Sequence, residues 1–243
     1  MAVNLTFLGT GAAFAPHAYN ASILVDRSIL LDAGAPLTVH LPKAGVSLDA
    51  PRSVLLSHFH ADHTFGIAWL MLGRVLENEH TPSLTVYGPT GTTDYLRTLL
   101  DFAWGEEMRE LSWDRLQLSV HELKGGDVFE VEGSRARAYP MLHSRRLNCL
   151  GFTIERDGVR LGYSGDAMMS PALEELVGAS DHMIIEMTYD AKPGPIHLAR
   201  PDVEGLMERH PGTRFIITHR TTDGEVSGAV MARDFLTLQL PLR

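Results

Sequence analysis

Apolar positions in this chain fall first into short runs separated by turn residues, which is the pattern of β-strands. Strands are predicted at Asn4–Leu8, Ala21–Val25 and Ser28–Asp32, with Asp26 and Arg27 making a tight hairpin connection. The remaining predicted strands are Val54–Leu56, Leu84–Tyr87, Leu116–Glu122, Val128–Val131, Ala136–Pro140, Leu150–Arg156, Val159–Tyr163, Met183–Glu186, Arg214–Thr218 and Phe235–Leu240. The last of these alternates in polarity and is expected to close an edge of a sheet.

Between these runs the apolar spacing changes to that of helices. A helix is predicted over Thr64–Glu79, where Ile67, Leu70, Met71 and Val75 lie on one face. The other predicted helices are Leu37–Ala44, Thr92–Phe102, Ser170–Val177 and Ala199–Arg209. Two strand-rich halves, each followed by helices, indicate an α/β protein in which two sheets lie between helical layers.

A cluster of polar side chains follows the predicted strand Val54–Leu56. The run S-H-F-H-A-D-H contains His58, His60, Asp62 and His63. Four ligand-type side chains at the end of an apolar strand would be costly to bury without a metal ion to satisfy them. Imidazole nitrogen and carboxylate oxygen suit divalent zinc, iron, manganese or cobalt. The cluster therefore predicts a metal site.

Three more candidate ligands occupy the same kind of position. His143, Asp166 and His219 each lie at the C-terminal end of a predicted strand, where sites collect in layered α/β folds. One tetrahedral ion cannot use seven ligands, whereas two ions sharing one carboxylate can, and this leaves positions open for a hydroxide and a substrate oxygen. The sequence therefore predicts a hydrolase with two metal ions.

Composition and charge restrict the class of protein. The 243 residues, 44% of them hydrophobic, can bury a sizeable core, and the absence of linkers and repeats predicts a single domain over residues 1–243. A formal net charge of −9 argues against extended nucleic acid as a partner. We find no signal-peptide pattern and no membrane span, and the single Cys149 suits a reducing compartment, so a cytoplasmic protein is expected.

These motifs resemble a known family. S-H-F-H-A-D-H, His143, S-G-D ending at Asp166 and I-T-H ending at His219 are similar to the metal motifs of the metallo-β-lactamase superfamily. The sequences L-T-F-L-G-T-G, N-A-S, L-L-D-A-G and V-Y-G-P-T-G are similar to those of its ribonuclease Z-like branch, which includes small phosphodiesterases. The resemblance extends from about residue 3 to residue 220 and implies the four-layer αββα fold.

The resemblance also implies roles for individual side chains. It assigns His58, His60 and His143 to one ion and Asp62, His63 and His219 to the other, with Asp166 bridging. Zn²⁺ is the expected metal, with Mn²⁺ or Fe²⁺ as alternatives. A hydroxide between the ions would attack phosphorus or a carbonyl carbon, and Asp62 would orient it. Glu186 and His197 lie where this branch carries a Glu and a His that protonate the leaving group.

Four functions remain open, in order of preference. The first is a phosphodiesterase acting on small or cyclic phosphodiesters. The second is a tRNA 3′-end endonuclease of the ribonuclease Z type. Against it stand the acidic charge, Tyr19 in place of a basic residue, and a single predicted hairpin between His143 and Asp166, where that enzyme carries a long tRNA-gripping arm. The third is a hydrolase of a lactone, thioester or β-lactam. The fourth is a metal-stabilised binding module, which the complete set of seven candidate ligands disfavours.

Surface positions raise two further questions. Arg145, Arg146 and Arg220 stand close to candidate ligands, and both substrate binding and a solvated position remain open for them. The aromatic segment 102–113 is interpreted as a surface helix packed on the core, with a lid or a dimer contact as the alternative. The resemblance implies a homodimer, and the candidate interface is the stripe Ile67, Trp69, Leu70, Met71 and Leu72.

Overall fold

The computed structural model describes residues 2–78, 80–192 and 194–241, and these form two sheets that face each other. The first sheet has the strand order β14 (Thr237–Leu240), β1 (Val3–Gly9), β2 (Ser22–Val25), β3 (Ile29–Leu31), β4 (Ser53–Leu55), β5 (Thr85–Pro89) and β6 (Ser119–Leu123). The second has the order β13 (Val230–Met231), β12 (Arg214–Thr218), β11 (His182–Glu186), β10 (Val159–Tyr163), β9 (Cys149–Arg156), β8 (Ser134–Met141) and β7 (Val128–Val131).

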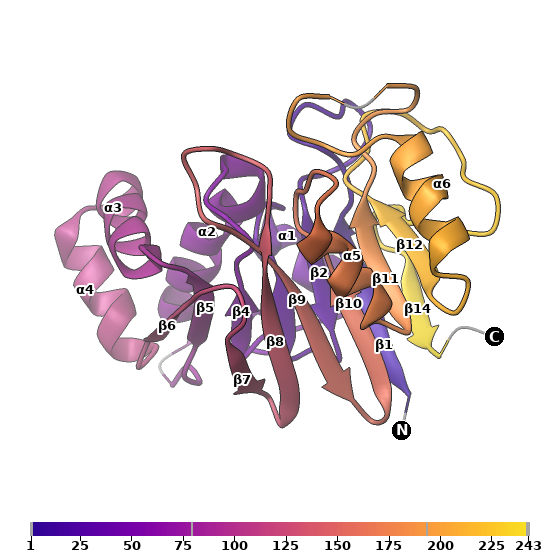
Figure 1. Ribbon diagram of the computed structural model, residues 1–243. Coiled ribbons are helices and arrows are strands. Elements are labelled where there is room, and N and C mark those ends of the chain that lie inside the picture. Colours follow the sequence, from indigo (N-terminus) through magenta and orange to yellow (C-terminus); the bar gives the residue numbers. More distant parts are fainter. Residues whose placement is uncertain (1, 79, 193, 242–243) are drawn as a thin grey trace.

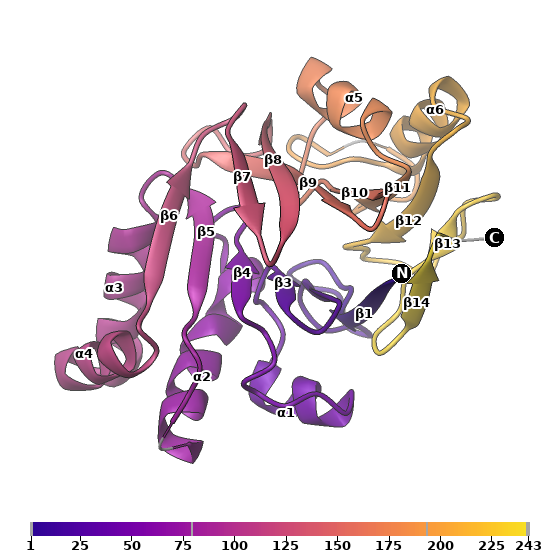
Figure 2. The same ribbon diagram turned by 90° about the horizontal axis from the view of Figure 1, so that it is seen from below.

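Helices cover the outer face of each sheet, as the view from below shows (Figure 2). The helices α1 (Leu37–Lys43), α2 (Ala61–Glu77), α3 (Thr92–Trp104) and α4 (Glu106–Arg115) lie on the first sheet, whereas α5 (Pro171–Gly178) and α6 (Arg200–Arg209) lie on the second (Figures 1 and 2). The predicted αββα layering is confirmed.

Alternation along the strands produces three apolar cores. In β2, Ile23 packs in the core between the sheets, whereas the next residue, Leu24, packs in the core beneath the helices of the first sheet. The second sheet alternates in the same way, since Ile184 faces the other sheet and Met183 faces α5 and α6. Strands buried on both faces in this way are apolar throughout, and this is why continuous apolar runs in the sequence predict them.

The structure refines several predicted boundaries. The helix predicted over Thr64–Glu79 begins earlier, at Ala61, because the metal-motif residues themselves form its first turn, and Glu79 lies outside the described residues. The segment 102–113 is helical on both sides of Gly105, whose φ of +83° separates α3 from α4. The interpretation as a surface helix packed on the core is confirmed for Trp104 and Trp113, whereas Phe102 is exposed. The two-residue strand β13 is not among the predicted strands. None of the described helices is both long and apolar enough to cross a bilayer.

Candidate metal centre

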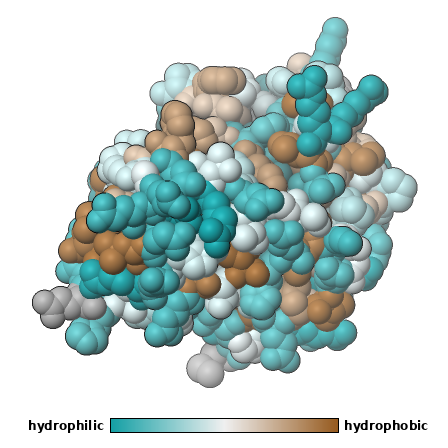
Figure 3. Space-filling model, turned by 90° about the vertical axis from the view of Figure 1, so that its left-hand side faces the viewer, coloured by the Kyte–Doolittle hydropathy of each residue, from teal (hydrophilic) through white to brown (hydrophobic). Residues whose placement is uncertain are grey.

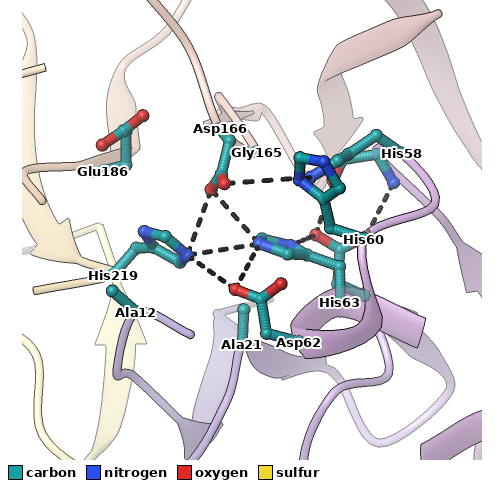
Figure 4. A network of polar contacts seen from close by, with 12 residues as sticks. Ala12, Ala21, His58, His60, Asp62, His63, Gly165, Asp166, Glu186 and His219 are labelled. Carbon is teal, nitrogen blue, oxygen red and sulfur yellow. Dashed lines mark hydrogen bonds and ion pairs between the residues drawn. The ribbon is translucent and has the colours of Figure 1, made fainter. Parts of the chain in front are cut away.

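All seven candidate ligands come together at one end of the two sheets, and Figure 4 labels six of them, all except His143. Each sheet contributes through its strand ends. The motif at residues 58–63 runs from β4 into the first turn of α2, and the other three candidates follow β8, β10 and β12. The donor atoms form two groups of four that share Asp166, and within each group they lie within 4.8 Å of one another. The two groups are His58, His60, His143 and Asp166, and Asp62, His63, Asp166 and His219.

The first group converges on Asp166 Oδ2. His60 Nδ1 lies 3.0 Å from His58 Nε2 and 3.1 Å from His143 Nε2. Asp166 Oδ2 lies 3.8 Å and 3.6 Å from the Nε2 atoms of His58 and His143. Three ring nitrogens and one carboxylate oxygen at these separations are the donor set that a small divalent ion takes.

The second group converges on the other oxygen of the same carboxylate. Asp166 Oδ1 lies 3.2 Å from His63 Nε2 and 3.3 Å from His219 Nε2, and Asp62 Oδ2 lies 3.5 Å and 3.3 Å from the same two nitrogens. Among the described residues, no hydrogen bond satisfies the buried Oδ1. A buried carboxylate oxygen without a hydrogen bond is costly unless a cation pairs with it, so the donor set fits a metal ion.

The charges within the cluster shift several pKa values. Although burial raises it, the charges of His219 and His63 hold the pKa of Asp166 well below its usual value. Burial, followed by the charge of His63, lowers the pKa of His58 well below its usual value. For His63 burial lowers the pKa, but Asp166 and Asp32 together raise it well above normal. The negative charges that favour a proton on His63 also favour a metal cation in its place.

Asp32 is a site residue that our sequence reasoning missed. It is fully buried just after β3 and accepts hydrogen bonds from His63 Nδ1 at 2.7 Å, Ser57 N and Oγ at 2.7 Å, and Tyr163 Oη at 2.6 Å. Ser57 Oγ in turn lies 3.0 Å from His58 Nδ1. A carboxylate behind a ligating histidine fixes its tautomer and ring orientation. The available signal was the sequence L-L-D-A-G, an aspartate directly after an apolar strand.

The predicted proton-donor pair lies beside the second group. Glu186 is fully buried at the end of β11, and its Oε1 lies 2.9 Å from His197 Nδ1. Although burial lowers the pKa of His197, the hydrogen bond and charge of Glu186 raise it above its usual value. Thr188, which was not predicted, contacts Glu186, His197 and His219 through its hydroxyl.

Backbone constraints at two positions bring the parts of the site together. A Cβ on Gly34 would lie 1.7 Å from the carbonyl oxygen of Asp62, so only glycine lets the loop after β3 pass so close to the metal motif. His219 has a φ of +52°, in the left-handed region that side chains other than glycine rarely adopt. Such strain is typical of functional positions that the surrounding structure holds in place.

Candidate ligands line two cavities, and only one of these cavities contains more than one of them. A cavity of about 620 Å³ is lined by His60, Asp62, Asp166, His197 and His219, together with Phe14, Phe65, Tyr189 and Ile196 among others. The other, of about 670 Å³, has His143 as its single candidate ligand and Arg145 among its lining residues. The smaller cavity is therefore the candidate active site. Arg220 donates to the carbonyl oxygens of Thr222, Gly224 and Ala232 and holds its own loop.

Comparison with known proteins identifies the family. The family model described as anti-Pycsar protein Apyc1 matches residues 3–220, nearly the whole chain. The chain belongs to the Apyc1 family. It is thereby a member of the ribonuclease Z-like branch of the metallo-β-lactamase superfamily, which confirms the resemblance seen in the sequence motifs.

Other proteins that are similar to this chain include ribonucleases and a diphosphatase. Ribonuclease BN of Cronobacter sakazakii is 29% identical over 188 residues, which cover 72% of this chain and 58% of that protein. The short form of human tRNase Z has a TM-score of 0.79 at 21% identity, covering 98% of this chain and 100% of that one. A diphosphatase of the PhnP family has a TM-score of 0.73 at 19% identity, covering 99% and 98%. The structural likeness concerns the fold, and the chain spans about half the length of the ribonucleases that it matches in sequence.

Proposed function

We propose that this protein is a metal-dependent phosphodiesterase that acts on small phosphodiesters, including cyclic ones. The observation that carries the proposal is the lining of the 620 Å³ cavity. It contains four candidate ligands and His197, whereas no lysine or arginine is found among its described lining residues. A polyanion needs several basic side chains along its path. A single phosphodiester needs only the metal ions to neutralise its charge.

We further propose that two ions, with Zn²⁺ preferred over Mn²⁺ or Fe²⁺, occupy the two groups and share Asp166. When bound, such ions lower the pKa of a water molecule and neutralise the charge that develops on phosphate oxygens. The chain's own residues set the geometry. Asp62 lies at the cavity wall and is available to orient a nucleophile, while burial of His58 and His63 keeps water away from the ligand nitrogens.

His197 is the proposed donor of the leaving-group proton. Its Nδ1 contacts Glu186, and its Nε2 has no hydrogen-bond partner among the described residues, so one nitrogen is fixed and the other is available. The imidazole is half-buried and lines the same cavity as Asp62 and Asp166. An alkoxide leaving group requires such an acid, whereas nitrophenolate does not.

RNA 3′-end cleavage is the second candidate, because several relatives in sequence are named ribonuclease Z or ribonuclease BN. Two features weigh against it. The residue before Asn20 is Tyr19, which provides no basic side chain. Its backbone N–H donates a hydrogen bond to Asp234. Between His143 and Asp166 the chain forms only the β9–β10 hairpin, whose strands pair from Val159 with Arg156 onward.

We also propose that the protein forms a homodimer in the cytoplasm. Phe65 and Trp69 on α2 are each 56% exposed, and Phe102 on α3 is 92% exposed. Figure 3 looks onto the side formed by α3 and α4, where hydrophobic residues, in brown, form patches among hydrophilic ones. Exposed apolar side chains that gather on one face are typical of an interface. The predicted stripe is wrong as an interface except at Trp69, because Ile67, Leu70, Met71 and Leu72 are buried.

The test of the proposed function is hydrolysis of bis-p-nitrophenyl phosphate by metal-analysed protein, before and after chelation and re-addition of Zn²⁺ or Mn²⁺. We expect chelator-sensitive turnover with about two metal ions per chain. Asp166→Ala should lose both turnover and metal. Cyclic nucleotides and a tRNA precursor are then compared. Cleavage of the precursor alone would favour the ribonuclease, and ester or lactone hydrolysis without phosphodiester hydrolysis would contradict the proposal.

A further inference from the structure

The hydroxyl of Thr188 stands at the junction between the proposed proton donor and the metal centre. Thr188 lies two residues beyond the end of β11 and is 4% exposed. Its Oγ1 lies 2.6 Å from Glu186 Oε2, 2.9 Å from His219 Nδ1 and 3.2 Å from His197 Nδ1. It also lies 3.2 Å from the carbonyl oxygen of His219. One oxygen atom therefore contacts three side chains of the site.

The single proton of this hydroxyl determines the direction of the contacts. A carboxylate can only accept, and the contact with Glu186 is the shortest, so Thr188 donates to Oε2. Its lone pairs then accept from imidazole N–H groups. With a metal ion bound to His219 Nε2 beside Asp62 and Asp166, Nδ1 would be the nitrogen that carries the proton, and it would donate to Thr188.

We propose that Thr188 is a positioning residue for the reaction. Its hydroxyl holds Glu186 so that this carboxylate orients His197, and the same oxygen fixes the ring of His219 with Nε2 directed at the ligand cluster. The proposal rests on the proposed function for the part that concerns His197. The part that concerns His219 depends only on the donor set and the hydrogen bonds.

The first sheet contains a matching arrangement, which serves as an internal control. Ser57 Oγ donates to Asp32 Oδ2 at 2.7 Å and lies 3.0 Å from His58 Nδ1. The same carboxylate accepts directly from His63. Ser57 thus lies toward His58 as Thr188 lies toward His219. Its carboxylate partner, Asp32, has no hydrogen bond or ion pair with His197. Removing the Ser57 hydroxyl should affect the metal centre without affecting the leaving-group proton.

The test compares Thr188→Val, which keeps the branched shape without the hydroxyl, with Thr188→Ser and Ser57→Ala. Zn²⁺ affinity is measured by competition with a chelator. Both hydroxyl deletions should weaken it by about 10–100-fold, the usual effect of losing a group behind a metal ligand, and Thr188→Ser should restore it. Unchanged affinity in Thr188→Val would overturn the role toward His219, whether or not the protein hydrolyses phosphodiesters.

The kinetic arm uses two substrates that differ in leaving group, bis-p-nitrophenyl phosphate and a 3′,5′-cyclic nucleotide, at saturating Zn²⁺. Thr188→Val should lower kcat by about 10²-fold more for the cyclic nucleotide than for the aryl ester, because only the alkoxide needs an acid. Ser57→Ala should lower both rates equally. Equal losses on both substrates in Thr188→Val would overturn the role toward His197. A wild-type protein inactive on both substrates would instead refute the proposed function. The Zn²⁺ affinity of Thr188→Val relative to the wild type would still decide the role toward His219.

Discussion

Asp32 and Glu186 are two fully buried carboxylates at equivalent places in the two sheets. Asp32 follows β3 and Glu186 ends β11, and each accepts four hydrogen bonds. Each binds one imidazole directly, His63 or His197, and reaches a second through a hydroxyl group. Burying a carboxylate is costly unless hydrogen bonds satisfy it, and both are satisfied in the same way.

The difference between the two carboxylates lies in what they connect. Asp32 accepts from Tyr163 Oη, which comes from β10, so it joins the two sheets as well as supporting two candidate ligands. The donors to Glu186 all come from the second half of the chain. The same chemistry therefore contributes to assembly of the fold in one case and to orientation of the proposed proton donor in the other.

Asp32→Ala is expected to have the largest effect. It removes four hydrogen bonds, one of them between the sheets, and leaves the donors of Ser57, His63 and Tyr163 unpaired in the core. We expect a loss of about 4–5 kcal/mol in the free energy of unfolding, since breaking a buried charged network is strongly destabilising. Denaturant unfolding of the metal-free protein measures it. A loss below about 1 kcal/mol, the size of one neutral hydrogen bond, would contradict the structural role of Asp32.

Glu186→Gln should affect catalysis more than stability. The amide keeps the shape of the side chain but places an NH₂ group against donors such as Ala167 N or Thr188 N, which should cost about 3 kcal/mol of unfolding free energy. Without the negative charge His197 binds its proton less tightly, so kcat on a cyclic nucleotide should fall by about 10²–10⁴-fold. Bound zinc should remain near the wild-type amount. Weaker zinc binding, with kcat unchanged once Zn²⁺ is saturating, would show that Glu186 supports the metal centre and not the proposed proton donor.

Tyr163→Phe isolates the contact between the sheets. The phenol donates to Asp32 at 2.6 Å, and burial and the charge of Asp32 raise its pKa well above normal, which favours the protonated, donating form. Its removal should lower the free energy of unfolding by about 1.5–2 kcal/mol, the contribution of one hydrogen bond to a charged group. Ser57 and His63 still satisfy Asp32, so metal content should not change. A variant that loses metal would show that Tyr163 also supports the ligands.

The site residues that the sequence predicted are those whose role shows in the local pattern, and the residues that it missed depend on partners far away in the chain. The seven candidate ligands follow apolar strands, so local pattern was enough to find them, and the fold class followed from the alternation of strands and helices. Asp32 also follows a strand, but one aspartate there is indistinguishable from a turn residue. Its role depends on Tyr163, which is 131 positions away in the chain, and on strand neighbours that only the folded sheets define. Thr188 was missed for the same reason.

Glu174 is the exposed counterpart that tests whether burial, and not the number of partners, gives Asp32 and Glu186 their strength. It receives hydrogen bonds from Arg209 and His210, but its side chain is 33% exposed. Although burial raises it, these partners hold the pKa of Glu174 below its usual value. A lowered folded-state pKa means that the stabilisation is present above the unfolded pKa, near 4.3, and is lost as the pH falls through the folded value.

Glu174→Gln should therefore cost about 0.2–1 kcal/mol at pH 7, since solvent screens pairs of this kind. At pH values below the folded-state pKa the wild-type carboxyl is protonated, and the two unfolding free energies should converge. Urea unfolding of both proteins across this pH range measures the difference, and added salt should reduce it at pH 7 because exposed charges are screened. A loss of unfolding free energy as large as that of Glu186→Gln would show that three hydrogen-bond donors stabilise a carboxylate this strongly without full burial. A small, salt-sensitive loss would assign the strength of Asp32 and Glu186 to the exclusion of water around them.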